Sequence, residues 1–148
     1  EGIVPSEYND GVTNGHMTKQ YSTYITDAAY DMYWDFETYK DKYERINEKM
    51  KLELPDACRI WYIPWAYTTA DKSMPAVRLM ENQLLAHLNG MKEFLDGEEH
   101  KGGLMTFCWK GEHLGFYGMK EITEQGYWQN FFDRFKQIGR EITGEQPE

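Results

Sequence analysis

Hydrophobic side chains recur with helical spacing in three stretches of this chain. The members of the first stretch follow one another at intervals of three and four residues: Ala29, Met32, Phe36, Tyr39, Tyr43, Ile46 and Met50. This spacing places them along one stripe of a helix, for which Thr26 is a suitable N-cap. Two further stripes predict helices in the same way. They consist of Val77, Met80, Leu84, Leu88, Met91 and Leu95, and of Trp128, Phe131, Phe135, Ile138 and Ile142.

Residues 30–37 allow a second interpretation. Tyr30, Met32 and Trp34 alternate with polar neighbours, and alternation is the pattern of a half-buried strand. The unbroken stripe that runs on to Met50 favours a helix. The sequence predicts a helix here and leaves a strand as the alternative.

Two other segments read as strands, residues 59–67 and residues 104–109. The first is rich in Ile, Trp and Tyr, and its Pro64 marks a bulge or an end. The second follows the glycine pair at 102–103. A helix of about twenty residues between two strands is typical of a βαβ unit with parallel strands. We therefore expect an α/β fold of βα units in series, with a parallel strand pair and the shape of a partial or half barrel.

An α+β fold is the alternative. In it, residues 104–109 would form a hairpin with residues 114–119, beside three helices. The cysteines distinguish the two folds, because Cys58 begins its strand and Cys108 ends its own. In a parallel pair they lie roughly 15–20 Å apart, too far for a disulfide.

The bulk properties limit the classes of function. A chain of 148 residues is expected to form one domain, here residues 21–142, with an irregular arm at 1–20 and a polar tail at 143–148. The net charge of −9 argues against nucleic acid and anionic membranes as partners. We expect a soluble protein. A chain that begins at Glu1 is compatible with a mature secreted protein, a trimmed chain or a piece of a longer one.

The predicted strand ends carry the candidate chemistry. Ligands of α/β proteins bind at the carboxyl ends of the strands, and the groups expected there are Trp34, Asp35, Glu37, Trp65, Tyr67, Trp109, Glu112 and His113. Aromatic rings there would stack on sugar rings, and carboxylates would accept hydroxyl hydrogen bonds. Glu112 with Glu37 or Asp35 is the expected acid–base pair for glycoside hydrolysis.

Other chemistries find little support in the sequence. It contains no nucleophile elbow, no phosphate-binding glycine loop and no zinc-binding H-E-x-x-H motif. His87 lies near the apolar stripe of its helix and is expected to be a satisfied or half-exposed helix residue and not a ligand. We expect neither a metal nor a cofactor.

The run from residue 82 to residue 117 resembles the end of a glycoside-hydrolase (β/α) barrel, and the resemblance spans about residues 30–142. The resemblance rests on NQLLAHL at 82–88, GGLMTFCWK at 102–110 and LGFY at 114–117. It implies a long helix before a last strand that ends in an aromatic residue lining the sugar site. The strand that ends at Tyr67 lacks the glutamate that many such enzymes place there. A full barrel also needs about 200–250 residues, so the resemblance implies a partial barrel, an assembling half or a fragment.

Together these observations predict a carbohydrate-directed protein, part of a glycoside hydrolase. The alternatives are a non-catalytic acidic module that binds a basic protein surface, or a small-molecule binder. Assembly into a homo-oligomer or a larger complex is compatible with each.

Overall fold

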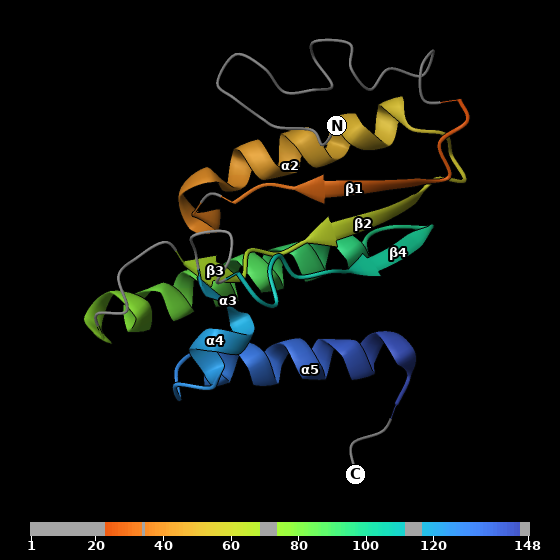
Figure 1. Ribbon diagram of the computed structural model, residues 1–148. Coiled ribbons are helices and arrows are strands. Elements are labelled where there is room, and N and C mark those ends of the chain that lie inside the picture. The colour runs from red at the N-terminus through yellow and green to blue at the C-terminus, as the bar shows by residue number, and fades with distance from the viewer. Residues whose placement is uncertain (1–22, 34, 69–73, 112–116, 146–148) are drawn as a thin grey trace.

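The centre of the fold is a three-stranded parallel sheet alternating with helices. The computed structural model describes residues 23–33, 35–68, 74–111 and 117–145, with the side chains of residues 74–79 excepted. The strands are β1 (Asp27–Asp31), β2 (Arg59–Ile63) and β4 (Lys101–Leu104), in the order β1-β2-β4. Along the chain, helix α2 (Phe36–Glu53) connects β1 to β2, and α3 (Met74–Asp96) comes after β2 and before β4 (Figure 1). The predicted α/β class and the parallel pairing of the second and third of these strands are confirmed.

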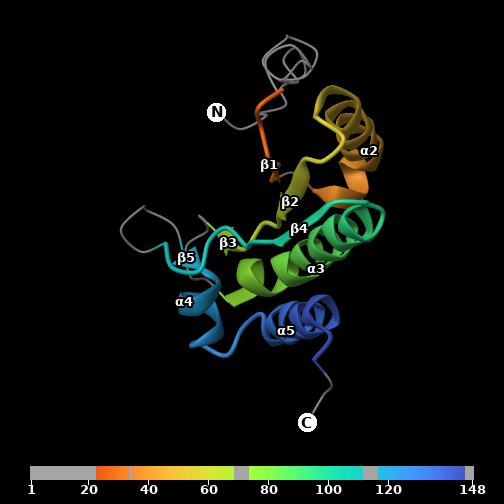
Figure 2. The same cartoon turned by 90° about the vertical axis from the view of Figure 1, so that its right-hand side faces the viewer.

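Helices α2 and α3 cover the same face of this sheet (Figure 2). Alternate strand residues point toward them, so Ala28 and Tyr30 of β1 and Ile60 and Tyr62 of β2 are buried. They pack with Phe36, Tyr43, Ile46 and Met50 of α2 and with Met91 and Leu95 of α3. The opposite face carries the exposed or half-buried members of β1 and β2: Asp27, Ala29, Asp31, Arg59, Trp61 and Ile63.

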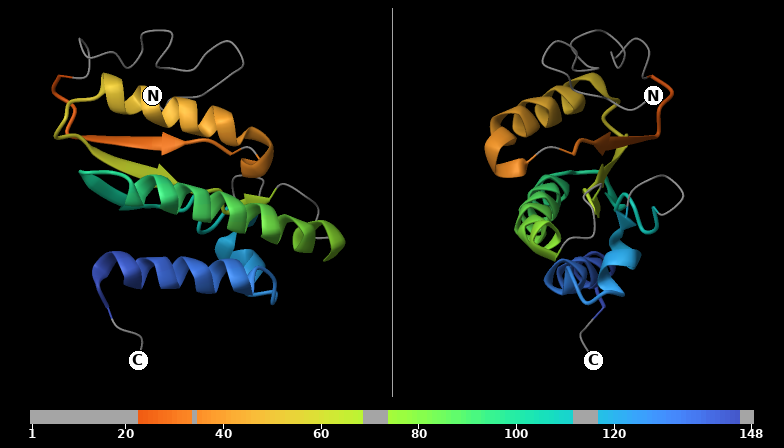
Figure 3. Two further views of the ribbon diagram at one scale, coloured as in Figure 1. Left: turned by 180° about the vertical axis from the view of Figure 1, so that it is seen from behind. Right: turned by 60° about the vertical axis from the view of Figure 1, so that its left-hand side comes forward.

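A second core lies on the other side of α3. Helix α5 (Gln129–Thr143) packs there beside α3 (Figure 3). The short helix α4 (Met119–Thr123) contributes Met119 and Ile122 to the same core. Strands β3 (Tyr67–Thr68) and β5 (Tyr117–Gly118) form a small antiparallel pair. Since β5 pairs with β3, the described part of the chain does not contain the alternative hairpin between residues 104–109 and 117–119 as a strand pair.

The prediction of a helix from Thr26 onward is wrong. Residues Asp27–Asp31 form β1, which pairs residue by residue with β2, and the helix begins only at Phe36. The Thr26 carbonyl accepts the Arg59 amide, at 2.9 Å, instead of starting a helix. Asp35 is the N-cap and accepts the Thr38 amide at 2.8 Å. Pairing with a neighbouring strand outweighs the local helical stripe, as tertiary contacts often do.

The second predicted strand is displaced by three residues. Strand β4 includes the glycine pair that the sequence suggested as a break. Both glycines lie against the Trp61 indole, and a Cβ on Gly102 would be 2.5 Å from Trp61 Cδ1 and 2.7 Å from the Ile60 carbonyl oxygen. Glycine is needed here because the indole occupies the space of a side chain. Cys58 and Cys108 are both free, as the parallel arrangement requires. No helix among the described residues is long and apolar enough to cross a membrane.

Candidate functional site

Five residues gather where the parallel strands end, and we call them the rim cluster: Asp31, Tyr33, Trp65, Tyr67 and Phe107. Asp31 is the last residue of β1, and Tyr33 follows it. Trp65 and Tyr67 follow the end of β2, and Phe107 follows β4. Because the strands run in parallel, their carboxyl ends meet at one edge of the sheet, the usual place for a ligand site in α/β proteins.

The aromatic rings of the rim cluster contact one another directly. Tyr33 stacks on Phe107, with ring centroids 5.8 Å apart and an interplanar angle of 23°. Tyr67 meets both of them edge to face, with its centroid 5.5 Å from that of Tyr33 and 5.7 Å from that of Phe107. The Trp65 indole lies next, 5.9 Å from the Tyr67 ring. Phe107 remains 37% exposed, so part of the apolar surface of the cluster is in contact with solvent.

Asp31 provides the charged group of this cluster. Its half-buried carboxylate accepts a hydrogen bond from the Tyr33 hydroxyl, and burial raises the pKa of the carboxyl. Burial and the neighbouring Asp31 charge also raise the pKa of Tyr33 and of Tyr67. The site therefore holds an acceptor that is more basic than an ordinary aspartate, next to neutral tyrosine hydroxyls.

Backbone hydrogen bonds fix the two segments that carry the rings. The Ala66 amide donates to the Phe107 carbonyl at 2.7 Å, and the Phe107 amide donates to the Pro64 carbonyl at 3.1 Å. These bonds continue the parallel pairing past the ends of β2 and β4. The backbone beyond the two strands is thus joined by the same kind of hydrogen bonds as a strand pair. These bonds fix the position of Trp65 relative to Phe107.

The His87 side chain of α3 forms hydrogen bonds with the backbone of two segments that lie next to the rim cluster, at Trp65 and at Met32. Its Nδ1 accepts the Trp65 amide at 3.1 Å, so its Nε2 carries the proton and donates to the Met32 carbonyl at 2.7 Å. The Tyr43 hydroxyl lies 2.9 Å from Nε2 and donates to the same carbonyl. Burial lowers the pKa of His87 to about 4. The expectation of a satisfied helix residue is confirmed.

The residues predicted for the site are distributed unevenly. Trp65 and Tyr67 lie in the rim cluster. Asp35 caps α2, where bonds to Thr38 lower its pKa, and Glu37 is exposed in the first turn of that helix. Trp109 packs on Phe132 of α5, at 6.2 Å between centroids, and is 49% exposed. Trp34, Glu112 and His113 lie outside the described residues, so their roles stay predictions.

Three members of the rim cluster were missed from the sequence: Asp31, Tyr33 and Phe107. The available signal was the alternation of Tyr30, Asp31 and Met32. Followed as a strand, it places Asp31 on the face opposite Tyr30, near the carboxyl end. The competing helical stripe concealed this, because in a helix Asp31 is only an outward-facing charge.

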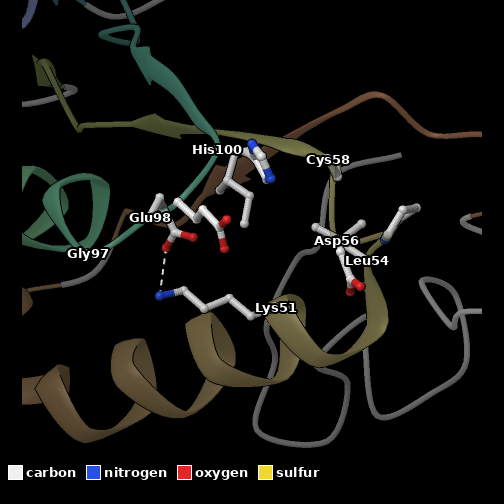
Figure 4. Close-up of a pocket in the computed structure, with 10 residues that line it drawn as sticks. Lys51, Leu54, Asp56, Cys58, Gly97, Glu98 and His100 are labelled. Carbon is white, nitrogen blue, oxygen red and sulfur yellow. Dashed lines mark ion pairs between the residues drawn. The ribbon is translucent and has the colours of Figure 1, made fainter.

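A separate pocket of about 290 Å³ lies at the opposite, amino end of the sheet. We call it the amino-end pocket. It is lined by Lys51, Leu54, Pro55, Asp56, Cys58, Ile60, Gly97, Glu98, Glu99 and His100. Figure 4 shows the Lys51 ammonium facing the Glu98 carboxylate, with Nζ 2.8 Å from Oε1. The buried Glu98 carboxylate also accepts the Tyr62 hydroxyl at 2.6 Å. Its charge is therefore already compensated within the protein, as a structural ion pair requires.

The described residues do not form a metal site. Among them, no group of three or more His, Cys, Asp or Glu side chains converges closely enough to hold an ion. Chemically, the rim cluster combines flat apolar rings with a hydrogen-bond acceptor and tyrosine hydroxyls. Such a set suits a ligand that has both an apolar face and hydroxyl groups.

Comparisons of the chain with protein-family models, curated proteins and solved structures found no match.

Proposed function

We propose that this protein binds carbohydrate at the rim cluster. The observation that carries the proposal is the Asp31 carboxylate at the end of β1, half-buried beside the rings of Tyr33 and Tyr67. A sugar ring presents an apolar face of C–H groups and a rim of hydroxyls. The exposed Phe107 ring suits the apolar face of the sugar, and the Asp31 carboxylate accepts a hydrogen bond from one of its hydroxyl groups.

The position of the cluster supports the same proposal. A ligand that docks at the carboxyl ends of parallel strands meets side chains from three separate segments. Here residues 31–33, 65–67 and 107 supply them, and backbone bonds of 2.7 and 3.1 Å fix the last two segments to each other. A preorganised site loses little conformational entropy when a ligand binds.

A catalytic form of this function needs a second carboxyl group. In glycoside hydrolysis two carboxyl groups flank the scissile bond, about 5 Å apart in retaining enzymes and about 6.5–9.5 Å apart in inverting ones. We propose Glu112 as the partner of Asp31, in place of the pairs with Glu37 or Asp35. Asp35 is engaged as the cap of α2, at 2.8 Å from the Thr38 amide. The raised pKa of Asp31 suits an acid catalyst.

An acidic protein-interaction module is less well supported. That function would be favoured by a contiguous acidic surface on the outer side of α2. The exposed residues there carry both signs: Lys40, Asp41, Glu44, Arg45 and Glu48. Lys40 and Glu44 also form an ion pair, with 3.9 Å between Nζ and Oε1. The outer face of α2 is therefore a mixed, solvated surface without strong preference for a basic partner.

A glycan array tests the proposal when it is combined with two aspartate variants. Asp31→Asn keeps the shape of the side chain and removes its charge. Asp27→Asn is the matched control, because Asp27 lies on the same strand and the same face, at the opposite end. We expect wild type and Asp27→Asn to bind the same glycans and Asp31→Asn to bind them about tenfold more weakly, since a hydrogen bond to a charged group contributes about 1.5–3 kcal/mol. Failure of the wild-type protein to bind any glycan would overturn the proposal.

A further inference from the structure

The indole N–H of Trp65 has no hydrogen-bond partner in the described part of the chain, although the nitrogen is buried. Among the described residues it is the one buried side-chain nitrogen or oxygen in this condition. The indole nitrogen of Trp61 on β2, by contrast, donates to Asp27 at 2.9 Å. An unpaired buried donor costs about 1–3 kcal/mol and is rare in native proteins, so it calls for an explanation.

The Trp65 ring packs against the second core and also contacts Tyr67 of the rim cluster. The Trp65 ring lies 5.9 Å from that of Tyr67, which in turn contacts Tyr33 and Phe107. The Trp65 backbone amide donates to Nδ1 of His87 at 3.1 Å, and the next amide, of Ala66, donates to the Phe107 carbonyl. The main chain on both sides of the indole is therefore fixed. The indole cannot find another partner by a shift of its backbone.

We infer that Trp65 Nε1–H is a specificity-determining donor for a neutral sugar unit, and this inference rests on the proposed function. The N–H donates to a ring or hydroxyl oxygen of the bound sugar while Asp31 accepts from another hydroxyl. Because the nitrogen is buried in the unliganded chain, this inference requires the sugar to displace the side chains that cover it, although the backbone of the site stays fixed. The free-energy cost of the unpaired Trp65 N–H is then present in the unliganded protein and absent from the complex.

One hydrogen-bond donor, the Trp65 indole N–H, and one acceptor, the Asp31 carboxylate, together select the class of ligand. A site built to hydrogen-bond a ligand discriminates strongly against analogues that leave its buried groups unpaired. A flat aromatic molecule would stack on Phe107 but would satisfy neither the Trp65 donor nor the Asp31 acceptor. A uronic acid would place a second negative charge near the Asp31 carboxylate. Neutral sugars with both a free hydroxyl and an oxygen acceptor are the class that satisfies both groups.

Trp65→Phe and Trp61→Phe form a matched pair for the test. Both remove one indole N–H near the sheet, but within the part of the chain that the structure describes only that of Trp61 has a partner. The probes are neutral trisaccharides of glucose, mannose and N-acetylglucosamine, with a glucuronic acid trisaccharide for comparison. We expect calorimetric affinity for the neutral trisaccharide that binds best to fall about tenfold in Trp65→Phe and to stay unchanged in Trp61→Phe. The glucuronic acid trisaccharide is expected to bind wild type more weakly.

An NMR measurement separates the lost hydrogen bond from lost packing. The Trp65 indole N–H resonance is identified by its disappearance in Trp65→Phe. On titration of wild type with the neutral trisaccharide, we expect it to move downfield and its exchange with solvent to slow. If it does not respond while the sugar binds, or if Trp65→Phe keeps full affinity, the inference fails and the proposed function stands. If no trisaccharide binds the wild-type protein, both fail.

Discussion

At the scale of single residues, two aspartates of β1 show how position sets electrostatics. Asp27 lies at the solvent-exposed start of β1, and hydrogen bonds from Arg59 and Trp61 lower its pKa to about 2. Asp31, four residues later on the same face, is half-buried and has a raised pKa. Folding therefore favours the charged form of Asp27 and disfavours that of Asp31. A carboxyl group held at a cost to stability is a common sign of a functional residue.

Removing the charge of Asp31 and removing that of Asp27 are expected to change the free energy of unfolding in opposite directions. Asp31 contributes stability below its unfolded pKa of 3.8, and this stability is lost as the pH rises through its raised pKa in the folded state. At pH 7 its charge is thus destabilising, and Asp31→Asn should raise the free energy of unfolding. Asp27→Asn should lower it, because the lowered pKa of Asp27 gives stability at all pH values above 3.8. Urea denaturation at pH 7 measures both, and a loss of stability in Asp31→Asn would contradict this account.

His87 is expected to make the protein sensitive to moderately acidic pH. Burial lowers its pKa from 6.5 to about 4. Its contribution to stability is complete above pH 6.5, and it is lost as the pH falls from there toward 4, because the unfolded chain takes up a proton first. The loss is on the order of 3 kcal/mol. Denaturation curves at pH 7, 6, 5 and 4 should show a steeper decline for wild type than for His87→Gln. Parallel declines in the two proteins would exclude His87 as the cause.

At the scale of secondary structure, two glycines in helices test packing against helix propensity. A Cβ on Gly90 of α3 would overlap the ring of Phe36, whereas one on Gly139 of α5 would meet nothing within 4 Å. Both substitutions by alanine gain about 1 kcal/mol of helix propensity. Gly139→Ala should therefore raise the free energy of unfolding by roughly that amount.

Gly90→Ala should instead destabilise the protein. Phe36 is buried and packs on Tyr43, with 4.9 Å between ring centroids, so its ring has little room to move. Overpacking a core typically costs about 1–3 kcal/mol, which exceeds the gain in propensity. Thermal and urea denaturation of both variants measure the difference. A stabilised Gly90→Ala variant would show that α2 and α3 are not packed as described.

The cap of α2 separates a structural role of Asp35 from a catalytic one. Asp35→Ala removes the acceptor of the Thr38 amide and should cost about 1 kcal/mol. Asp35→Asn retains an N-capping acceptor and should cost much less. If Asp35→Asn nevertheless abolishes a glycosidase activity while the free energy of unfolding is kept, the acid–base role first predicted for Asp35 would be restored.

The elements also show where sequence reasoning succeeds. Helix α3 was predicted because Leu84, Leu88, Met91 and Leu95 lie on one stripe, and all four are buried. The strand predicted over 59–67 is shorter, because β2 ends at Ile63, and Trp65 and Tyr67 follow its end instead of belonging to it. Strand β1 was not predicted, because the stripe that runs on to Met50 favours a helix there, and only the pairing of β1 with β2 overrides it. Asp31 and Tyr33 were lost with it, since their role depends on that pairing.

At the scale of the whole molecule, the two ends of the parallel sheet are chemically different. The carboxyl end carries the rim cluster, with an exposed ring and an indole N–H that has no partner in the described protein. The amino end has a pocket of about 290 Å³, but its buried Glu98 is already paired with Lys51 at 2.8 Å and with Tyr62 at 2.6 Å. A buried polar group without a hydrogen-bond partner, and not the presence of a pocket, indicates where a ligand is needed.

The most direct test of this account is an NMR titration of the labelled protein with the neutral trisaccharide that binds best, followed through backbone amide shifts. We predict that the largest shifts fall on residues 31–33, 65–67 and 107, with residues 51–60 and 97–100 unaffected. Shifts confined to the amino-end pocket, around Glu98 and His100, would contradict the central claim that the strand ends form the sugar site.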